Sequence, residues 1–433
     1  MRHVIEVTVT GSIGLMAIFC VDFLSLFYVS RLDDDKLTAG VGYATTMLFV
    51  AISINIGTMI AASALVARRI GAGDRDGARR MATSGLMLAT LVAVLVSVLM
   101  LAAMPWLLSA IGAKGVPLEV ATRFLWVTLP ANALMGAGMT LSGLLRSVGD
   151  PRRAMRVTLY GGIVTAIADP ALIFGLGLGT DGAAIATVIA RVIYLLVGLN
   201  GIIRVHDLLE KPHLHALKGD ASPFFAIAVP AMLTNVATPV SNLLLMRVLA
   251  PFGEAAIAAN AILDRLVPVA FGVLFALSGA VGPILGQNLG ARRYDRLRQA
   301  MRDALLFATV YCAFAWLVLL LARHQISLLF GVDGATARYV AFFCIISGGA
   351  WMFNGFLFVA NAAFNNLGFP LYSTMFNWGR ATLGTLPFAY FGAQWAGVEG
   401  AMAGVACGSV MFGLLAVFVA FRSVGKLEHR AQA

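Results

Sequence analysis

The sequence predicts an all-α polytopic membrane protein. Its twelve transmembrane helices are expected to form two six-helix lobes, related by a pseudo-two-fold axis along the membrane normal. The first observation behind this prediction is composition, since 60% of the 433 residues are hydrophobic and 12% are charged. Soluble globular chains contain about 45–50% apolar and about 25% charged residues. The other two observations are long runs without charge and an internal repeat.

Seven runs contain no Asp, Glu, Lys or Arg: residues 37–67, 82–113, 124–145, 221–246, 266–291, 304–322 and 400–421. Each is close to or above the roughly 20 residues that a helix needs to span a bilayer. An eighth run, 339–379, is too long for one span and breaks at the turn signal in 365–370. We therefore expect helices at 8–30, 39–66, 82–105, 120–146, 157–177, 182–203, 223–250, 256–285, 303–322, 338–365, 370–392 and 399–421. The first lacks a basic start and a small-residue cleavage site, so we do not interpret it as a cleavable signal.

The formal net charge of +10 is concentrated in alternate loops. With the N-terminus inside, most arginines and lysines fall in the loops after the second, fourth, sixth and eighth predicted helices, whereas several acids fall in the opposite loops. This positive-inside pattern predicts a multi-pass protein of the cell (inner) membrane with both termini in the cytoplasm. The basic loops should contact anionic lipid of the bilayer. No separate basic domain is present, so we expect no nucleic-acid partner.

The cysteine pattern indicates neither a metal site nor a redox pair. The four cysteines stand alone inside apolar segments, without a Cys-x-x-Cys pair. We interpret them as buried small hydrophobic residues and expect no cofactor other than a coupling ion.

An internal repeat relates the two halves of the chain. A shift of 219 residues superposes seven identities within positions 71–90, including Gly71 on Gly290 and Asp76 on Asp295. A shift of 217 superposes Pro170 on Pro387. Each helix thus matches the sixth helix after it, and such parallel repeats occur in secondary transporters with the substrate path between the lobes. We expect an N-terminal lobe at 1–203, a cytoplasmic linker at 204–222, and a C-terminal lobe with a short cytoplasmic tail at 223–433.

Two acids, Asp22 and Asp169, lie inside predicted membrane helices, where a carboxylate is expensive and marks a functional site by default. The repeat places Ser241 and Leu386 at the equivalent positions, so only the first lobe carries both acids. Pro170 cannot donate a hydrogen bond and bends its helix, which frees carbonyl oxygens beside Asp169. Thr165 shares the face of Asp169 one turn earlier. These oxygens suit a proton or a small hard cation.

Two acids close together in a poorly hydrated site resist double ionisation. Such a pair can load a proton near neutral pH and release it after a conformational change.

Further polar, aromatic and sulfur-containing residues on the predicted helices are candidates for substrate binding. Helix packing explains many such residues, and the others would give a hydrated cavity with an adaptable wall. The candidates are Phe27, Asn55, Met59, Asn132, Met135, Asn235, Asp264, Asn354 and Arg380. Arg380 is a candidate ion-pair partner for Asp264, whereas Arg191 lies near a helix end, where a long side chain can reach the membrane interface.

Several motifs resemble those of multidrug and toxic compound extrusion (MATE) transporters, and the resemblance covers nearly the whole chain. It rests on Val-Asp-Phe at 21–23, Arg-Arg-Ile-Gly-Ala-Gly at 68–73, Gly-Gln-Asn-Leu-Gly-Ala at 286–291, and above all the segment 168–187 that begins Ala-Asp-Pro. The resemblance implies a secondary active transporter rather than an enzyme. It also implies export of bulky, mostly cationic organic compounds by alternating access, driven by inward flow of H⁺ or Na⁺. We expect small organic, cationic partners and a monomer.

The resemblance also implies a cation site formed by aspartates of the first and fifth helices, an asparagine one turn before the second aspartate, and a threonine of the sixth helix. Asp22, Asp169 and Thr187 match three of these positions and would hold Na⁺ if Na⁺ is the coupling ion. Thr165 replaces the asparagine, which favours H⁺ over Na⁺. Thr238 and Asn354 stand where the NorM-like branch has acids, so the sequence favours the DinF-like branch.

Three other functions compete with that of a cation-coupled exporter. A flippase for lipid-linked saccharides, from the same superfamily, would need a strongly cationic cavity, whereas most arginines here lie in predicted loops. A membrane enzyme would need a catalytic cluster at membrane depth, which the sequence does not indicate. A channel fits a parallel repeat with isolated buried acids less well than alternating access does. The flippase is the main alternative.

Overall fold

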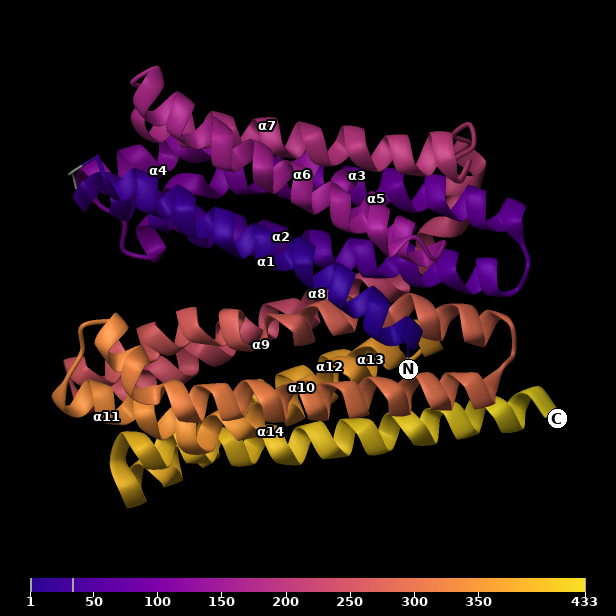
Figure 1. Ribbon diagram of the computed structural model, residues 1–433. Helices are drawn as coiled ribbons and strands as arrows, with labels where there is room; N and C mark the ends of the chain where they lie inside the picture. Colours follow the sequence, from indigo (N-terminus) through magenta and orange to yellow (C-terminus); the bar gives the residue numbers. More distant parts are fainter. Residues whose placement is uncertain (1, 33–34, 433) are drawn as a thin grey trace. The chain divides into compact units, whose positions relative to one another are not determined.

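The computed structural model describes residues 2–32 and 35–432, which are helical and contain no strand (Figure 1). The side chains that lie outside this description are those of Arg2, His3, Asp22, Phe23, Leu26, Ser30, Asp35, Leu214 and Gln432. The α-helices are α1 (Arg2–Ser30), α2 (Asp35–Gly71), α3 (Arg75–Ala110), α4 (Gly115–Thr128), α5 (Asn132–Ser147), α6 (Pro151–Pro170), α7 (Gly179–Leu199), α8 (Leu214–Leu249), α9 (Glu254–Gly290), α10 (Tyr294–Leu329), α11 (Gly334–Phe342), α12 (Gly348–Leu367), α13 (Pro370–Gly379) and α14 (Leu386–Gln432). Short π-helical segments are η1 (Ala171–Gly175), η2 (Asn200–Val205), η4 (Phe343–Ser347) and η5 (Arg380–Gly384), and η3 (Ala250–Phe252) is a 3₁₀-helix.

The twelve predicted spans are present in the described chain. Ten helical segments are long and apolar enough to cross a membrane, and α4 with α5 forms an eleventh span that is bent by 56°. The twelfth comes from α14, because Ala396 and Gly397 leave helical geometry and divide it into two helices. The predicted turn at 365–370 is confirmed, since Gly368 ends α12 in the left-handed region with φ +89°. The chain is a multi-pass membrane protein.

The chain forms two compact units, each with its own apolar core. We call residues 13–232 the N unit and residues 1–12 with 233–433 the C unit. The division runs through α1 and α8, so the first part of α1 belongs to the C unit and the first part of α8 belongs to the N unit. Val4 of α1 lies in the core of the C unit, and Phe224 of α8 lies in a core of the N unit. Under the 219-residue shift, position 13 corresponds to position 232, so both helices change unit at equivalent points.

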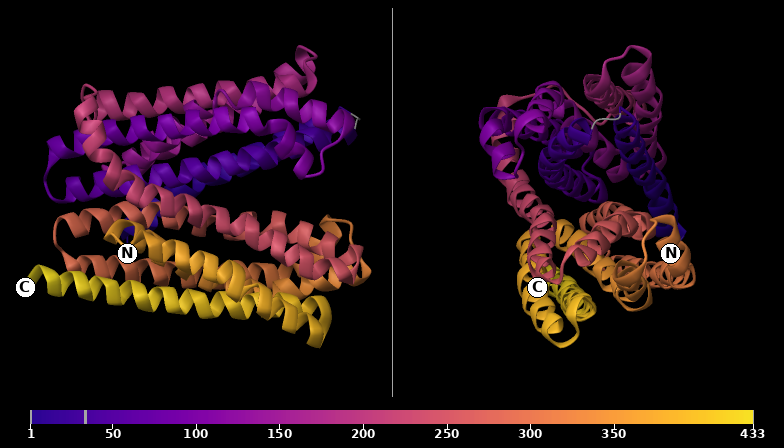
Figure 2. Two further views of the ribbon diagram at one scale, coloured as in Figure 1. Left: turned by 180° about the vertical axis from the view of Figure 1, so that it is seen from behind. Right: turned by 90° about the vertical axis from the view of Figure 1, so that its left-hand side faces the viewer.

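The packing of each unit confirms the internal repeat. In the N unit, α5 packs against α2, α3, α6 and α7, and in the C unit α12 packs against α9, α10, α13 and α14. The partners of α5 and α12 are the helices that the repeat matches with one another. The right-hand view of Figure 2, which looks along the helices, shows the helices of each unit gathered in a bundle.

The fourth span departs from the continuous helix predicted for 120–146. α4 ends at Thr128 and α5 begins at Asn132, because Pro130 lacks an N–H and cannot continue the hydrogen-bond pattern of the helix. The break frees the carbonyl of Thr128, which accepts a hydrogen bond from Arg191 of α7. Arg191 is only 4% exposed. Its guanidinium therefore satisfies a carbonyl at a buried helix end. The sequence-based prediction that Arg191 reaches the membrane interface is wrong.

The fifth and sixth spans pack unusually closely, and glycine makes this possible at two points. A Cβ at Gly161 would lie 1.8 Å from Cε1 of Tyr194, and a Cβ at Gly182 would lie 2.8 Å from the carbonyl carbon of Leu172. The second contact presses the start of α7 onto η1, the π-helical segment that follows Pro170. Figure 1 shows α6 and α7 side by side. The close packing fixes the register of these two helices.

Polar contacts tie the irregular segment after α7 to the starts of α3 and α6. Arg79 pairs with Asp207 at 3.1 Å, and Arg75 donates to the carbonyl of His206 at 2.9 Å. Asp150 caps α6, because its Oδ1 accepts from the backbone N–H of Arg153 at 3.0 Å, and its Oδ2 lies 3.0 Å from Nε2 of His206. Partial burial alone would raise the pKa of Asp150, but the hydrogen bonds from Arg153 and His206 outweigh it and lower that pKa below its ordinary value.

We predict that Asp150→Ala lowers the free energy of unfolding of the detergent-solubilised protein by about 1 kcal/mol at neutral pH, as expected for the loss of a helix N-cap. A carboxyl with a lowered folded-state pKa stabilises above its unfolded pKa, and this contribution disappears as the pH falls through the folded value. The difference between wild type and variant should therefore shrink below about pH 4. Thermal unfolding monitored across pH tests this. Asp76→Ala, which removes an exposed acid from the first turn of α3, is the control; an equal loss in both variants would contradict the capping role.

Candidate functional site

The contacts between α1 and α6 place position 22 close to Asp169 along the helix axes. Gly14 of α1 packs against Thr158 of α6, and Ser25 of α1 lies close to the Asp169 carboxyl. Both contacts join residues that are 144 positions apart in the sequence, so α1 and α6 run in the same direction in a constant register. Position 22 therefore lies about one helical turn before Asp169. The side chain of Asp22 itself lies outside the described residues.

The contacts between α6 and α7 bring Thr187 to the same level. The two glycine contacts described above lie on either side of Thr187 along α7. Interpolation between them places Thr187 within about two residues of the level of Asp169 along α6, because the two helices rise by similar amounts per residue. The structure thus places Asp169 and Thr187 at similar levels on neighbouring helices, and Thr165 lies one turn before Asp169 on α6.

Asp169 is completely buried, with 0% exposure. Neither carboxyl oxygen has a hydrogen-bond partner among the described residues, although the hydroxyl of Ser25 lies nearby. A buried polar group without a partner is costly in an apolar environment, so the carboxyl has unused capacity for a proton or a cation. Sequence reasoning missed Ser25, although its spacing of three residues after Asp22 puts it on the same helix face.

The hydroxyls of Thr165 and Thr187 donate to their own helices. Thr165 Oγ1 donates to the carbonyl of Gly161 and Thr187 Oγ1 donates to that of Ala183, each at 3.0 Å. Their oxygen lone pairs remain available as acceptors or ligands. With Asp169 they remain the candidate oxygen ligands for a proton or a hard cation, and their joint role stays a prediction. No cluster of three or more His, Cys, Asp or Glu side chains that could hold a metal ion occurs in the described part of the chain.

The C unit shows what the repeat builds at the equivalent place. Ser241, the counterpart of Asp22, lies 3.2 Å from the hydroxyl oxygen of Thr385, which directly precedes Leu386, the counterpart of Asp169. The equivalent positions of the two helices therefore approach each other in the C unit. There the meeting point holds a neutral hydroxyl pair, whereas the N unit carries carboxylates in these positions.

The predicted substrate residues of the N unit fall into different environments. Asn55 donates to Asn132 at 2.9 Å, and Asn132 donates to the carbonyl of Ala93 at 3.2 Å, so this buried pair joins α2, α3 and α5. Met59 accepts from Arg146, Met135 packs at the edge of a core, and Phe27 is exposed with the guanidinium of Arg31 over its ring. Their roles in substrate binding stay predictions.

In the C unit, Asp264 and Arg380 do not form the ion pair that the sequence suggested. Asp264 instead accepts a hydrogen bond from Asn260, one turn earlier on α9, at 3.2 Å. Arg380 opens the π-helical segment η5, and its carbonyl accepts from Thr385. π-Helical displacement of this turn changes the direction of its side chains relative to a regular helix, which sequence spacing could not reveal. Asn354 is buried on α12, and Asn235 is partly buried on α8.

The comparisons with known proteins establish the family. The MatE family model matches residues 12–171 and 230–391, which are equivalent segments of the two halves. The chain belongs to the MatE family, the multidrug and toxic compound extrusion transporters, and is a transporter rather than an enzyme. The resemblance drawn from the sequence is thereby confirmed, whereas the assignment to the DinF-like branch stays a prediction.

Individual relatives agree with this assignment. The chain is 27% identical to the FAD transporter of Shewanella oneidensis over 427 residues, which cover 97% of this chain and 94% of the relative. It is 23% identical to the multidrug export protein MepA of Staphylococcus aureus over 80% of this chain and 77% of that protein. The crystal structure of the MATE transporter VcmN of Vibrio cholerae in its bent form superposes with a TM-score of 0.93 at 22% identity, covering 99% of this chain and 97% of that one. This last likeness concerns the fold.

We predict that Gly182→Ala disrupts the candidate site. The added Cβ would meet backbone atoms of Leu172 and Ile173 at 2.8–2.9 Å, and such overpacking costs roughly 1–3 kcal/mol. The clash should separate α7 from η1 and lower both the unfolding temperature and transport. Gly175→Ala is the matched control, because a Cβ there meets nothing within 4 Å. Equal behaviour of the two variants would contradict the close packing of α7 on η1.

Proposed function

We propose that this transporter is a proton-coupled antiporter that exports bulky, mostly cationic organic compounds by alternating access. It would lie in the cell (inner) membrane with both termini in the cytoplasm. The observation that carries the proposal is Asp169, a fully buried carboxyl inside a membrane span with no hydrogen-bond partner among the described residues. An acid in this setting lowers its own burial cost by taking up a proton or a cation.

In this proposal Asp22 and Asp169 load a proton when the site is open to the side of higher proton concentration. A neutral site tolerates burial better than a charged one, so loading favours a conformation in which α1 and α6 close around the acids. The hydroxyl oxygens of Thr165 and Thr187 and the nearby Ser25 supply hydrogen-bond acceptors for the protonated state. Proton release to the other side returns the carboxylates to a form that favours the open conformation.

The residues favour H⁺ over Na⁺ as the coupling ion. Na⁺ would be held by Asp22, Asp169 and Thr187, and Thr165 would add a hydroxyl where the family has an amide oxygen. A threonine hydroxyl that already donates to its own helix is held close to the backbone, so it reaches a shared cation less readily than a longer amide side chain. A proton does not need several oxygen ligands, because one carboxyl oxygen is enough to bind it.

Two substrate classes follow from the relatives. Similarity to the multidrug export protein MepA supports export of drugs, and the exposed acid Asp264 of the C unit offers a charge that is complementary to organic cations. A second candidate is export of a flavin nucleotide, which the nearly full-length similarity to an FAD transporter favours. Flavin nucleotides carry phosphates, for which Arg380 on η5 is the suitable partner among the predicted substrate residues.

We predict that Asp169→Asn abolishes coupled transport in proteoliposomes without lowering the unfolding temperature. The substitution keeps the size of the side chain but removes the titratable group, and a buried carboxyl without a partner contributes little to stability. Asp264→Asn is the control, because it removes another acid from a membrane span. This variant should alter transport of organic cations but leave the proton-driven transport of other substrates unchanged. Retention of transport by Asp169→Asn would overturn the proposed role, and loss of the folded state would indicate a structural one.

We also predict that a pH gradient alone drives transport in proteoliposomes and that a Na⁺ gradient alone does not. A fluorescent organic cation such as ethidium and FAD would be tested separately under each gradient. Transport of the cation under the pH gradient supports the main proposal. Transport of FAD but not of the cation favours the flavin alternative, and transport that follows only the Na⁺ gradient contradicts proton coupling.

A further inference from the structure

The turn between α9 and α10 carries a different charge from its counterpart between α2 and α3, and the internal repeat allows the two turns to be compared position by position. Under the 219-residue shift, three small or acidic residues of the N unit become arginines in the C unit. The exchanges are Gly73 to Arg292, Asp74 to Arg293 and Gly77 to Arg296. The turn itself is the same in both units, so the arginines are additions to a conserved backbone geometry.

In the N unit, the charged side chains in and near the turn pair with groups of the same unit. Asp74 accepts from the backbone N–H of Gly77 at 2.8 Å, which caps α3, and pairs with Arg69 at 2.7 Å. The neighbouring cations are also occupied, since Arg79 pairs with Asp207 and Arg80 pairs with Asp220 at 3.2 Å. The basic residues of this turn therefore have internal partners.

In the C unit the corresponding turn lacks this compensation. Arg293 occupies the N-cap of α10 without a side-chain cap. Arg292 adopts φ +55° where Gly73 has φ +76°, and a non-glycine residue in the left-handed region is strained backbone of the kind found at functional sites. No ion pair to Arg292, Arg293 or Arg296 occurs within the described ranges.

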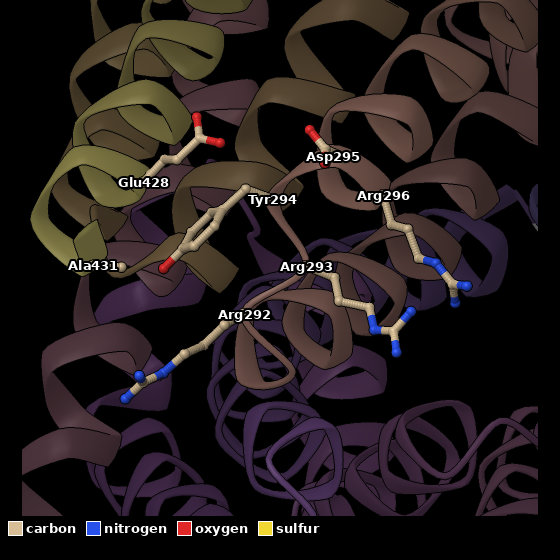
Figure 3. A pocket seen from close by; sticks show the side chains of 7 residues that line it. All are labelled: Arg292, Arg293, Tyr294, Asp295, Arg296, Glu428 and Ala431. Atoms are coloured by element: carbon tan, nitrogen blue, oxygen red, sulfur yellow. The ribbon is translucent and has the colours of Figure 1, made fainter.

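These arginines line a cavity of about 570 Å³ (Figure 3), together with Tyr294, Asp295, Glu428 and Ala431. Of the two acids of the cavity, Glu428 forms an ion pair with Arg298, whereas Asp295 is exposed and lies 3.9 Å from Arg298. The three arginines therefore outnumber the acids of the lining. In Figure 3, Arg293 and Arg296 extend to the same side of the start of α10, and Arg292 extends to the other. The cavity thus combines an excess of guanidinium groups with the uncapped N-terminus of a long helix.

We propose that this cavity binds a phosphate group, supplied by the headgroup of an anionic phospholipid. Guanidinium groups bind phosphate oxygens in bidentate geometry, and free N–H groups at a helix N-terminus add to the attraction. Both α9 and α10 are long enough to cross the membrane, so the turn between them lies outside the hydrocarbon core, on the side where its arginines can reach the headgroups. A phospholipid bound here would be attached to the C unit alone, since all lining residues belong to that unit. This inference is independent of the transported substrate.

The test compares two triple variants that each remove three positive charges. R292G/R293N/R296G restores glycines and a good capping residue at the positions where the N unit has Gly73, Asp74 and Gly77. R156Q/R204Q/R302Q removes three exposed arginines elsewhere. The purified, delipidated proteins would be titrated in detergent with dihexanoyl-phosphatidylglycerol, dihexanoyl-phosphatidylcholine and inorganic phosphate. The apparent affinity is read from the thermal unfolding temperature as a function of ligand concentration, and gel filtration and circular dichroism verify folding.

We expect phosphatidylglycerol to stabilise wild type saturably and to bind R292G/R293N/R296G at least about tenfold more weakly. The R156Q/R204Q/R302Q control should stay within about twofold of wild type, because its lost charges act only through screened long-range attraction. Saturable stabilisation by inorganic phosphate at the same arginines would support the phosphate site and assign it to a free anion rather than a lipid. Unchanged affinity of R292G/R293N/R296G, or an equal loss in the control, would overturn the proposal.

Discussion

Every backbone N–H and C=O inside a bilayer must find a partner within the protein, and the fold of this transporter depends on that requirement. It explains why the described chain is helical and why two departures from α-helix in the N unit have local partners. At the break beside Pro130 the freed carbonyl of Thr128 is taken by Arg191. After Pro170 the chain continues as the π-helical segment η1, against which the start of α7 packs through Gly182. The deviations that shape the candidate site are therefore stabilised by specific neighbours.

The repeat gives both units the same scaffold but different chemistry on it. Where α1 meets α6, the N unit has acids, and the equivalent place in the C unit is a hydroxyl pair between Ser241 and Thr385. The charged residues lie in the other unit at the next pair of equivalent turns. The turn between α2 and α3 of the N unit has glycine and aspartate where the turn between α9 and α10 of the C unit has arginines. Duplication preserves the backbone, because helix packing tolerates little change, whereas side chains at a few positions are free to take up separate tasks.

The sequence allowed the twelve spans, the turn at 365–370 and the repeat to be predicted, because hydropathy and charge act on long segments. It also singled out Asp169, since a charge in an apolar run is visible without a structure. Details that depend on side-chain direction were not accessible. The Asn55–Asn132 bond joins residues far apart in the chain, and the separation of Asp264 from Arg380 depends on a π-helical turn that leaves no clear pattern in the sequence. The bend at Pro130 was missed because the residues around it are as apolar as those of a continuous span.

Because α1 and α8 are each divided between the two units, the order of synthesis matters for folding. Residues near the N-terminus, such as Val4, pack in a core whose other members, such as Phe271 and Phe364, are synthesised more than 200 residues later. The first helix can enter the membrane early. The residues that pack against its N-terminal part are in the second half of the chain, so these contacts form only after that half is synthesised. Neither half is therefore a self-sufficient folding unit, although each contains six spans. The core of the C unit is thus completed by contacts between residues that are far apart in the sequence, and contacts of this kind form slowly.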